Sequence, residues 1–282
     1  YSFVDAAWEA DFSDNTSSPI LLANPIASQM GVMRSSLIGG LVNTLTYNLK
    51  RRTDRVRIFE IGRCFHPTQD KNAIAGFHQP QRLAALCAGT ALPVQWGEKS
   101  RPVDFYDIKA DLEAMLPNRS LRFEKHAHPA LHPGRSARVI LDGQSIGILG
   151  ELHPAQVQKY ELGTPPVVFE IDLAPLTEHP LPNYQPVSRF PSVERDLALL
   201  VAQEQAVQPL LDALRQGASP LIRHIELFDL YQGKAIDENK KSLAFRVVMQ
   251  DTAGTLADAV VDGAIQELLA IATQKFNAAL RS

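Results

Sequence analysis

Hydrophobic and polar residues follow a helical period early in the chain. From Met30 to Leu45 apolar residues recur every three or four positions, which predicts an amphipathic helix over 28–50 that begins at a serine cap. Two glycines, Gly39 and Gly40, fall in its middle, where each costs about 1 kcal/mol relative to alanine. A second helix packed closely against these glycines would explain them, and a loosely packed helix is the alternative.

Alternation with a period of two dominates the rest of the sequence up to residue 178 and predicts an antiparallel sheet with a few helices. Asp142-Gly143 lies between two apolar runs and fits the positive backbone angles of a tight hairpin turn. These features indicate an α+β domain over 1–178. The predicted strands are 1–4, 55–62, 82–88, 121–125, 167–173 and the hairpin 136–151, and the predicted helices are 104–116 and 153–160.

A proline-rich stretch separates this region from a second pattern. Prolines recur four times between residues 180 and 191 and resist both helix and sheet, so we expect a linker over 179–186. Residues 187–282 follow with the order strand, helix, strand, strand, helix, strand, which is the ferredoxin-like βαββαβ unit. Thr255 and Asp258 resemble a capping box for its last helix. The predicted elements are strands 196–201, 221–231, 242–250 and 278–281 and helices 205–215 and 255–276.

Composition narrows the functional class without deciding it. Of 282 residues, 28 are Lys or Arg and 31 are Asp or Glu, so no bulk basic charge marks a nucleic-acid binder. Cys64 and Cys87 lack a CxxC partner, which argues against a zinc knuckle or a disulfide framework and favours a reducing, cytoplasmic compartment. No apolar run reaches the roughly 18–20 residues needed to span a bilayer, so we expect no membrane partner. The first residues read as a strand already under way, and we interpret the sequence as a fragment cut upstream of Tyr1.

Several long segments, in order, carry a resemblance to a known family. The class II synthetase-like domain of the bacterial phenylalanyl-tRNA synthetase β subunit is similar to the segments LANPIASQMGVMRSSLIGGLVNTLTYNLKRRTDRVRIFEIGRCF, VDFYDIKADLEAML, ALHPGRSARVILDGQSIGILGELHP and VVFEIDLAPL. The anticodon-binding domain that ends that subunit is similar to RFPSVERDLALLV and LFDLYQGKAIDENKKSLAFRVVMQDTAGTL. The resemblance covers essentially the whole chain.

The resemblance implies a fold and a division of labour. It implies a class II-like antiparallel domain without a working active site, followed by a ferredoxin-fold anticodon-binding domain. In such an enzyme, a phenylalanine–tRNA ligase, the α subunit joins phenylalanine to tRNA(Phe) with ATP and Mg²⁺, and the β subunit assembles with α and a second β as (αβ)₂. We therefore expect no catalytic residue, metal or cofactor in this chain, and editing of misacylated tRNA upstream of it. The residues themselves agree with this expectation, because the sequence contains no Gly-rich phosphate-binding loop.

Asp229 and Tyr231 are the strongest candidates for contact with tRNA. Because they lie two apart in a predicted strand, both side chains project from one face. A tyrosine ring can stack on an unpaired base, a contact worth about 1–3 kcal/mol, and a carboxylate can accept from the amino and imino groups of guanine. The resemblance puts this position at the anticodon, whose first base for phenylalanine is guanine; the alternative is a tyrosine packed on the loop and an aspartate capping a turn. Ile225 and Leu227 share the same parity, so the face must change from buried to open along the strand.

Basic residues near that strand are candidates for phosphate contacts, which position RNA without reading its sequence. Solvated surface charge is the alternative for each of them. Residues 186–282 hold ten Lys and Arg against twelve Asp and Glu, a net charge of −2 that indicates a small local contact and not a basic clamp. The candidates are Lys234, Lys240, Lys241 and Arg246, with Arg189 and Arg195 beside them.

Two further patterns have plainer explanations. His126 and His128 form an HxH pair near two other histidines, but no acidic or cysteine partner stands beside them, so we interpret them as loop histidines and not as a zinc site. The leucines of the helix over 28–50 are expected in the core, in contact with the α subunit, or both. Two other functions stay open: a purely structural interaction module, which the near-neutral charge favours, and a free-standing enzyme that uses the class II-like sheet.

Overall fold

A computed structural model describes residues 1–14, 18–71, 73–74, 76–117, 119–177, 184, 187–233 and 236–281. Its internal contacts divide the chain into two compact units, Tyr1–Pro180 (unit 1) and Leu181–Ser282 (unit 2). The division falls in the stretch expected as a linker, of which only Tyr184 is among the described residues. Within the described ranges no helix combines the length and the apolar character needed to cross a bilayer.

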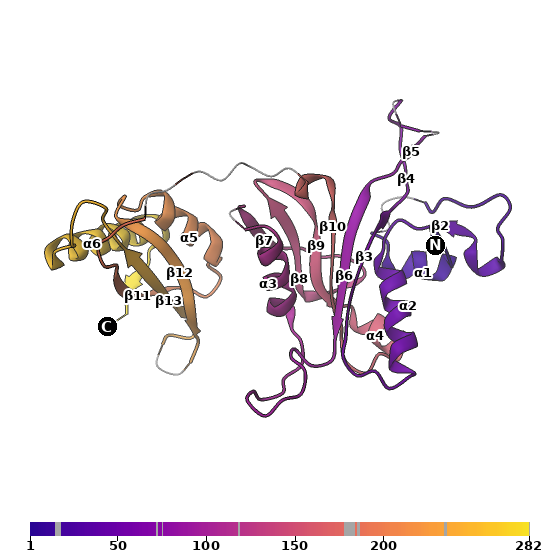
Figure 1. Ribbon diagram of the computed structural model, residues 1–282, viewed down its shortest axis with the longest axis horizontal. Helices are drawn as coiled ribbons and strands as arrows, with labels where there is room; N and C mark the ends of the chain where they lie inside the picture. The colour runs from indigo at the N-terminus through magenta and orange to yellow at the C-terminus, as the bar shows by residue number, and fades with distance from the viewer. Residues whose placement is uncertain are drawn as a thin grey trace. The chain divides into compact units, whose positions relative to one another are not determined.

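Unit 1 is built on a six-stranded antiparallel sheet, which confirms the α+β class expected for it. In spatial order its strands are β3 (Val56–Arg63), β6 (Gln81–Ala88), β10 (Val167–Asp172), β9 (Gln144–Leu152), β8 (Leu131–Leu141) and β7 (Leu121–Lys125). Helix α2 (Ile38–Leu49) packs on β3 and β6, and helix α3 (Phe105–Met115) packs on β9 and β10 from the opposite face (Figure 1). The alternating side chains of the strands therefore fill two separate cores, one under each helix.

Short elements complete unit 1. They are β1 (Phe3–Val4), α1 (Ala6–Phe12), η1 (Ser28–Met30), β2 (Val32–Met33), β4 (His66–Pro67), β5 (Phe77–His78), α4 (Pro154–Lys159) and η2 (Ala174–Leu176). Helix α1 packs directly against α2, where a Cβ placed on Gly39 would come within 3.1 Å of the Phe12 ring. Of the two explanations left open for the glycine pair, the close approach of a second helix holds at Gly39.

The helix expected over 28–50 begins ten residues later than predicted. Residues 28–30 form a 3-10 turn, and β2 then pairs with β1 before α2 starts at Ile38. The cause is tertiary: the hydroxyl of Ser36 and the N–H of Leu37 donate to the carboxylate of Glu170 in β10, which satisfies donors at the start of the helix. The sequence of residues 28–37 gives no sign that the start of the helix will bind Glu170, which lies 133 positions after Leu37.

The hairpin and the helix before it follow their sequence signals. Asp142 and Gly143 take φ angles of 49° and 89°, as the tight turn between β8 and β9 requires. Asp104 and Asp107 form a complete capping box at the start of α3, which ends before Pro117. The turn and α3 agree with the prediction to within a residue because their determinants are local, whereas β8 begins at Leu131, five residues before the predicted start of the hairpin.

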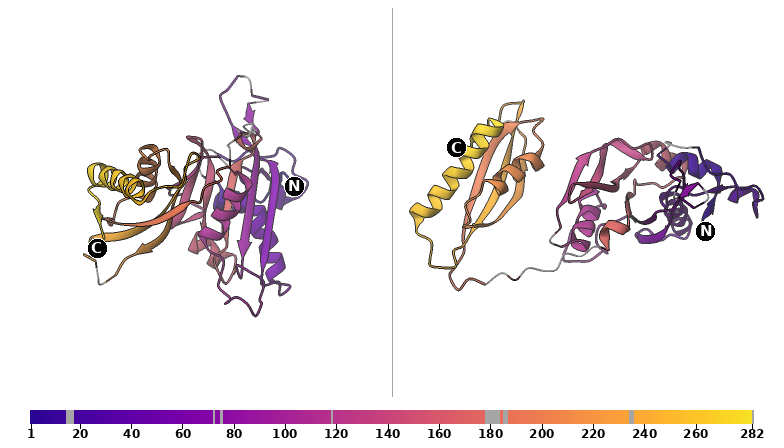
Figure 2. Two further views of the ribbon diagram at one scale, coloured as in Figure 1. Left: turned by 60° about the vertical axis from the view of Figure 1, so that its left-hand side comes forward. Right: turned by 90° about the horizontal axis from the view of Figure 1, so that it is seen from above.

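Unit 2 is an antiparallel βαββαβ unit, which confirms the ferredoxin-like fold expected for it. Its elements are β11 (Val193–Ala202), α5 (Val207–Gln216), β12 (Ile222–Tyr231), β13 (Lys240–Met249), α6 (Asp258–Phe276) and β14 (Ala279–Leu280), and the sheet order is β12-β13-β11-β14. Both helices lie on one side of the sheet (Figure 2). We call the other side, which no described helix covers, the open face.

The capping box expected at the start of the last helix is absent from the described contacts. Helix α6 begins at Asp258 with Ala257 at its cap position, and no side chain caps it. Asp258 instead lies 3.5 Å from the guanidinium of Arg195 in β11, so this acidic residue pairs with the neighbouring strand. The helix ends as a left-handed cap at Asn277, with φ 53°, which turns the chain into β14.

Candidate nucleic-acid interface

A β-bulge in β12 decides which side chains reach the open face. The register with β13 pairs Ile225 with Val247 and Leu227 with Phe245, but then pairs Asp229 with Ala244, so one residue of β12 is left over. Such an extra residue reverses the alternation of the side chains beyond it. Immediately upstream of the bulge, Ile225 and Leu227 point to the helices, whereas Asp229 and Tyr231 beyond it point to the open face. The change of face that the sequence required therefore occurs at Phe228.

Two aromatic rings on this part of the unit carry cations over them. The guanidinium carbon of Arg246 lies 4.8 Å from the centre of the Phe228 ring, and that of Arg281 lies 4.9 Å from the centre of the Tyr231 ring. The rings remain 46% and 37% exposed. Gly233 gives Tyr231 its position, because a Cβ there would stand 2.6 Å from the tyrosine hydroxyl. Aromatic faces bordered by guanidinium groups are surfaces on which an unpaired base can stack.

The other predicted contacts divide between the two faces of the sheet. Lys240 and Arg246 project from β13 onto the open face, the same face as Asp229 and Tyr231. Lys241 and Arg195 project from their strands onto the helix side of the sheet, and Lys241 is buried. Arg189 is exposed before β11, and Lys234 lies outside the described residues.

The basic residues of the group are largely paired with acidic ones. Nε of Arg246 lies 3.2 Å from Asp196 and 3.9 Å from Glu194, and the hydrogen bond with Asp196 raises the pKa of Arg246. Nζ of Lys240 lies 2.9 Å from Asp237. The open face is therefore not a basic surface, and its distinguishing features are its aromatic rings and the carboxylate of Asp229.

Sequence reasoning missed Phe228 and Arg281. Phe228 reads as one more apolar strand residue, yet its parity is opposite to that of the inward-facing Ile225 and Leu227, so ordinary alternation already places it on the open face. Arg281 is far from Tyr231 in sequence and reaches it only because β14 joins the same sheet. Its parity was the available signal for Phe228.

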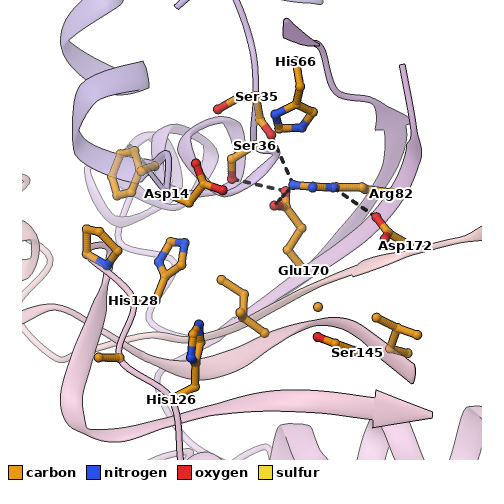
Figure 3. Close-up of a pocket in the computed structure, with 16 residues that line it drawn as sticks. Asp14, Ser35, Ser36, His66, Arg82, His126, His128, Ser145, Glu170 and Asp172 are labelled. Carbon is orange, nitrogen blue, oxygen red and sulfur yellow. Dashed lines mark hydrogen bonds and ion pairs between the residues drawn. The ribbon is translucent and has the colours of Figure 1, made fainter. Parts of the chain in front are cut away.

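Unit 1 has a separate polar pocket of about 420 Å³ on the α2 side of its sheet. Arg82, Glu170 and Asp172 lie at its centre, and His66, His126 and His128 line it, as Figure 3 shows. The lining residues come from four strands and the connecting loops: Phe12, Asp14, Ser35, Ser36, His66, Arg82, His126, Ala127, His128, Pro129, Ser145, Ile146, Gly147, Ile148, Glu170 and Asp172.

The charges at the centre of this pocket are satisfied within the chain. Nη1 of Arg82 lies 2.9 Å from Oε2 of Glu170 and 3.2 Å from the carbonyl oxygen of Ser35, while Nε lies 3.3 Å from Asp172. Burial raises the pKa of Glu170, whereas Arg82 and the N–H of Leu37 act to lower it. An anionic ligand would therefore meet a guanidinium whose charge two carboxylates already neutralise.

Three histidines that precede proline serve as local caps, and one of them, His128, lines the pocket. In three His-Pro sequences the Nδ1 atom accepts the backbone N–H two residues later, at 3.2 Å for His128, 3.0 Å for His132 and 3.1 Å for His153. Burial lowers the pKa of His66, and it lowers that of His128 to about 4. Within the described ranges, no three His, Cys, Asp or Glu side chains converge as metal ligands would.

Two family models match the chain and together cover nearly all of it. Residues 1–173 match the family described as phenylalanyl tRNA synthetase beta chain CLM domain. Residues 188–281 match the ferredoxin-fold anticodon binding domain.

Curated relatives and a solved structure extend this comparison. The chain is 56% identical over its whole length to the phenylalanine–tRNA ligase beta subunit of Dechloromonas aromatica and 54% identical to that of Aromatoleum aromaticum, and it spans 36% and 35% of those proteins. A solved structure of PylSc, a pyrrolysyl tRNA synthetase from Desulfitobacterium hafniense, matches 62% of this chain and 57% of its own at a TM-score of 0.44 and 17% identity. The chain thus spans about a third of the curated relatives.

Proposed function

The chain belongs to the phenylalanyl-tRNA synthetase β-chain family, and from that premise we propose that it holds the anticodon region of tRNA(Phe) without taking part in the chemistry. In the proposed ligase, the α subunit attaches phenylalanine with ATP and Mg²⁺. The observation that carries the proposal is the bulge at Phe228, which turns Asp229 and Tyr231 onto the open face of unit 2.

Recognition on the open face would combine stacking with one hydrogen-bonding carboxylate. Arg281 covers one side of the Tyr231 ring, so a base stacked on the other side would complete a guanidinium–ring–base stack. Asp229 is exposed on the same face and can accept from the N1–H and amino group of guanine. Contacts with the phosphates of the RNA backbone would then come from Lys240, Arg246 and Arg189, and from the remaining basic candidates.

The pocket of unit 1 supports a non-catalytic role for this chain. Arg82 is the cation at its centre, and Glu170 and Asp172 already neutralise its charge, so it attracts a phosphate less than an unpaired arginine would. ATP–pyrophosphate exchange by the chain without the α subunit would contradict this part of the proposal. A cytoplasmic location remains the prediction drawn from the two cysteines, which are free and buried.

Assembly with an α subunit and a second β subunit is the other part of the proposal. The relatives are named as beta subunits, which supports an α partner. Leu37, Leu41 and Leu45, at the start of α2 and within it, cannot contact an α subunit, because they are buried in the core between α2 and the sheet. The alternative of simple packing therefore holds for these three residues, and assembly would use other surfaces.

A structural interaction module without RNA affinity of its own is the second candidate. The pairing of Arg246 with Asp196 and Glu194 favours it, since these carboxylates would repel a phosphate backbone. Titration of the chain with tRNA(Phe), and with a version whose anticodon is changed, separates the two functions. Preference for the native anticodon, with affinity that falls as salt rises, supports recognition by the open face. Equal or absent binding supports the interaction module.

A further inference from the structure

Strand β3 of unit 1 carries apolar side chains on both of its faces, with Glu60 on the α2 side and an arginine at each end of the other side. Val56 and Ile58 pack into the core beneath α2. Phe59 and Ile61 project from the opposite face and are 72% and 51% exposed. A strand of an antiparallel sheet with one solvated face normally alternates apolar with polar residues, whereas a strand that is apolar throughout is normally covered on both sides.

The half of the sheet around these side chains has no helix over it. Helix α3 covers β9 and β10 on this face, and the described part of unit 1 places no helix over β3 and β6 on the same face, because α2 lies on the other one (Figure 1). Phe59 lies opposite Ala85 and Ile61 opposite Leu83 in the register with β6. We call Phe59, Ile61 and Ala85 the β3 shelf. Leu83 beside it already belongs to the core under α3, so the shelf is an open extension of that core.

Charged residues border the β3 shelf at its two ends. Arg57 is paired with Asp111 of α3, which closes the end near that helix. Arg63, at the other end, is exposed and donates to the carbonyl oxygen of Gln79. Strand β3 is also the edge strand of the sheet, and it has neither a proline nor a bulge to protect that edge. A covering segment would meet an apolar strip with an arginine at its far end.

We propose that an amphipathic helix of the same polypeptide, from outside residues 1–282, covers the β3 shelf. The helix would continue the layer that α3 begins and would place an acidic residue near Arg63. The curated relatives are about three times as long as this chain, so their polypeptides contain ample sequence for such a segment. A segment joined to unit 1 by its own chain would also bind at high effective concentration. This assignment is independent of tRNA binding.

Thiol labelling tests the proposal, because the native cysteines report little. Cys64 and Cys87 are buried, and burial raises the pKa of both thiols, that of Cys87 to about 11. Phe59→Cys would therefore supply the reactive thiol in the 282-residue chain. In the full-length subunit alone, we expect the same thiol to react at least about tenfold more slowly, as a contact of about 1.4 kcal/mol would require. Glu98→Cys, at an exposed position, is the control and should react equally fast in both proteins.

Three results would overturn the assignment. Equal labelling in both proteins would mean that the β3 shelf is a free surface. Slow labelling that appears only when the α subunit is added would make the occupant another chain. Slow labelling of the 282-residue chain itself, increasing with its concentration, would make the occupant a second copy. As an independent measure, Phe59→Glu should leave the stability of the short chain unchanged and lower that of the full-length subunit.

Discussion

Arg82 and Glu170 form an ion pair inside unit 1, with 2.9 Å between Nη1 and Oε2. The other oxygen of Glu170 accepts from Ser36 and Leu37, so one carboxylate joins two strands of the sheet to the first turn of α2. Glu170 is only 5% exposed, which makes loss of its charge costly for Arg82. The pair explains both where α2 begins and why the pocket beside it presents no unpaired cation at its centre.

Glu170→Gln keeps the shape of the side chain and removes its charge. We expect the free energy of unfolding of unit 1 to fall by about 3 kcal/mol, because the guanidinium of Arg82 loses its buried anionic partner and keeps only Asp172 as a counter-charge. Urea unfolding followed by tryptophan fluorescence measures this directly, since both tryptophans, Trp8 and Trp96, lie in unit 1. Glu124→Gln, at an exposed position, should change stability by less than about 0.5 kcal/mol. Equal stability of the two variants would show that the charge of Glu170 does not stabilise unit 1.

His128 should make the stability of unit 1 depend on pH. Its pKa in the folded chain is about 4, below the ordinary value of 6.5, because burial opposes the charged form. The unfolded chain therefore binds the proton first, and the stabilising contribution present above pH 6.5 is lost as pH falls towards 4, to a total of about 3 kcal/mol. His128→Asn retains an acceptor for the N–H of Ala130 and removes the titration. Its unfolding free energy should fall less steeply over this range; an unchanged slope would contradict the assignment to His128.

The sequence predicts elements whose determinants are local and fails where a distant residue intervenes. The capping box of α3, the Asp142-Gly143 turn and the alternation of β13 each depend on neighbours within a few positions. The start of α2 depends on Glu170, and Asp258 pairs with Arg195 instead of completing a cap. On the open face, spacing predicts that Asp229 and Tyr231 share a face, but which face they take follows from the bulge. Phe228 has the parity of an outward residue and could have been found from alternation, whereas Arg281 reaches the ring of Tyr231 only through the strand order.

Loss of the Tyr231 ring should weaken the use of tRNA. In the complete enzyme, Tyr231→Ala should raise the apparent KM for tRNA(Phe) by roughly tenfold, which corresponds to about 1.4 kcal/mol of lost stacking. The KM for phenylalanine and the rate of ATP–pyrophosphate exchange should not change. Tyr106→Ala, which removes an exposed ring from unit 1, serves as the matched control. Unchanged aminoacylation kinetics in Tyr231→Ala would count against the open face as the site.

Gly233→Ala tests the position of the ring without removing it. The added methyl group would stand 2.6 Å from the tyrosine hydroxyl, so the ring must swing away from the place it holds beside Arg281. Because the displaced atoms are the tip of an exposed side chain, we expect a change in stability within about 0.5 kcal/mol. The apparent KM for tRNA(Phe) should rise, but less than in Tyr231→Ala. A KM equal to that of the unmodified enzyme would show that the ring orientation is irrelevant.

The bulge at Phe228 also limits how this part of the protein can evolve. A slip of the register by one residue, with the length of β12 unchanged, would place Phe228 opposite Ala244 and turn Asp229 and Tyr231 towards the helices. Loss of Phe228 itself would remove the bulge and leave Asp229 opposite Ala244. Lineages of this family should therefore keep the pairing of Asp229 with Ala244, whereas the interval from Leu227 to Asp229 is free to shorten by one residue.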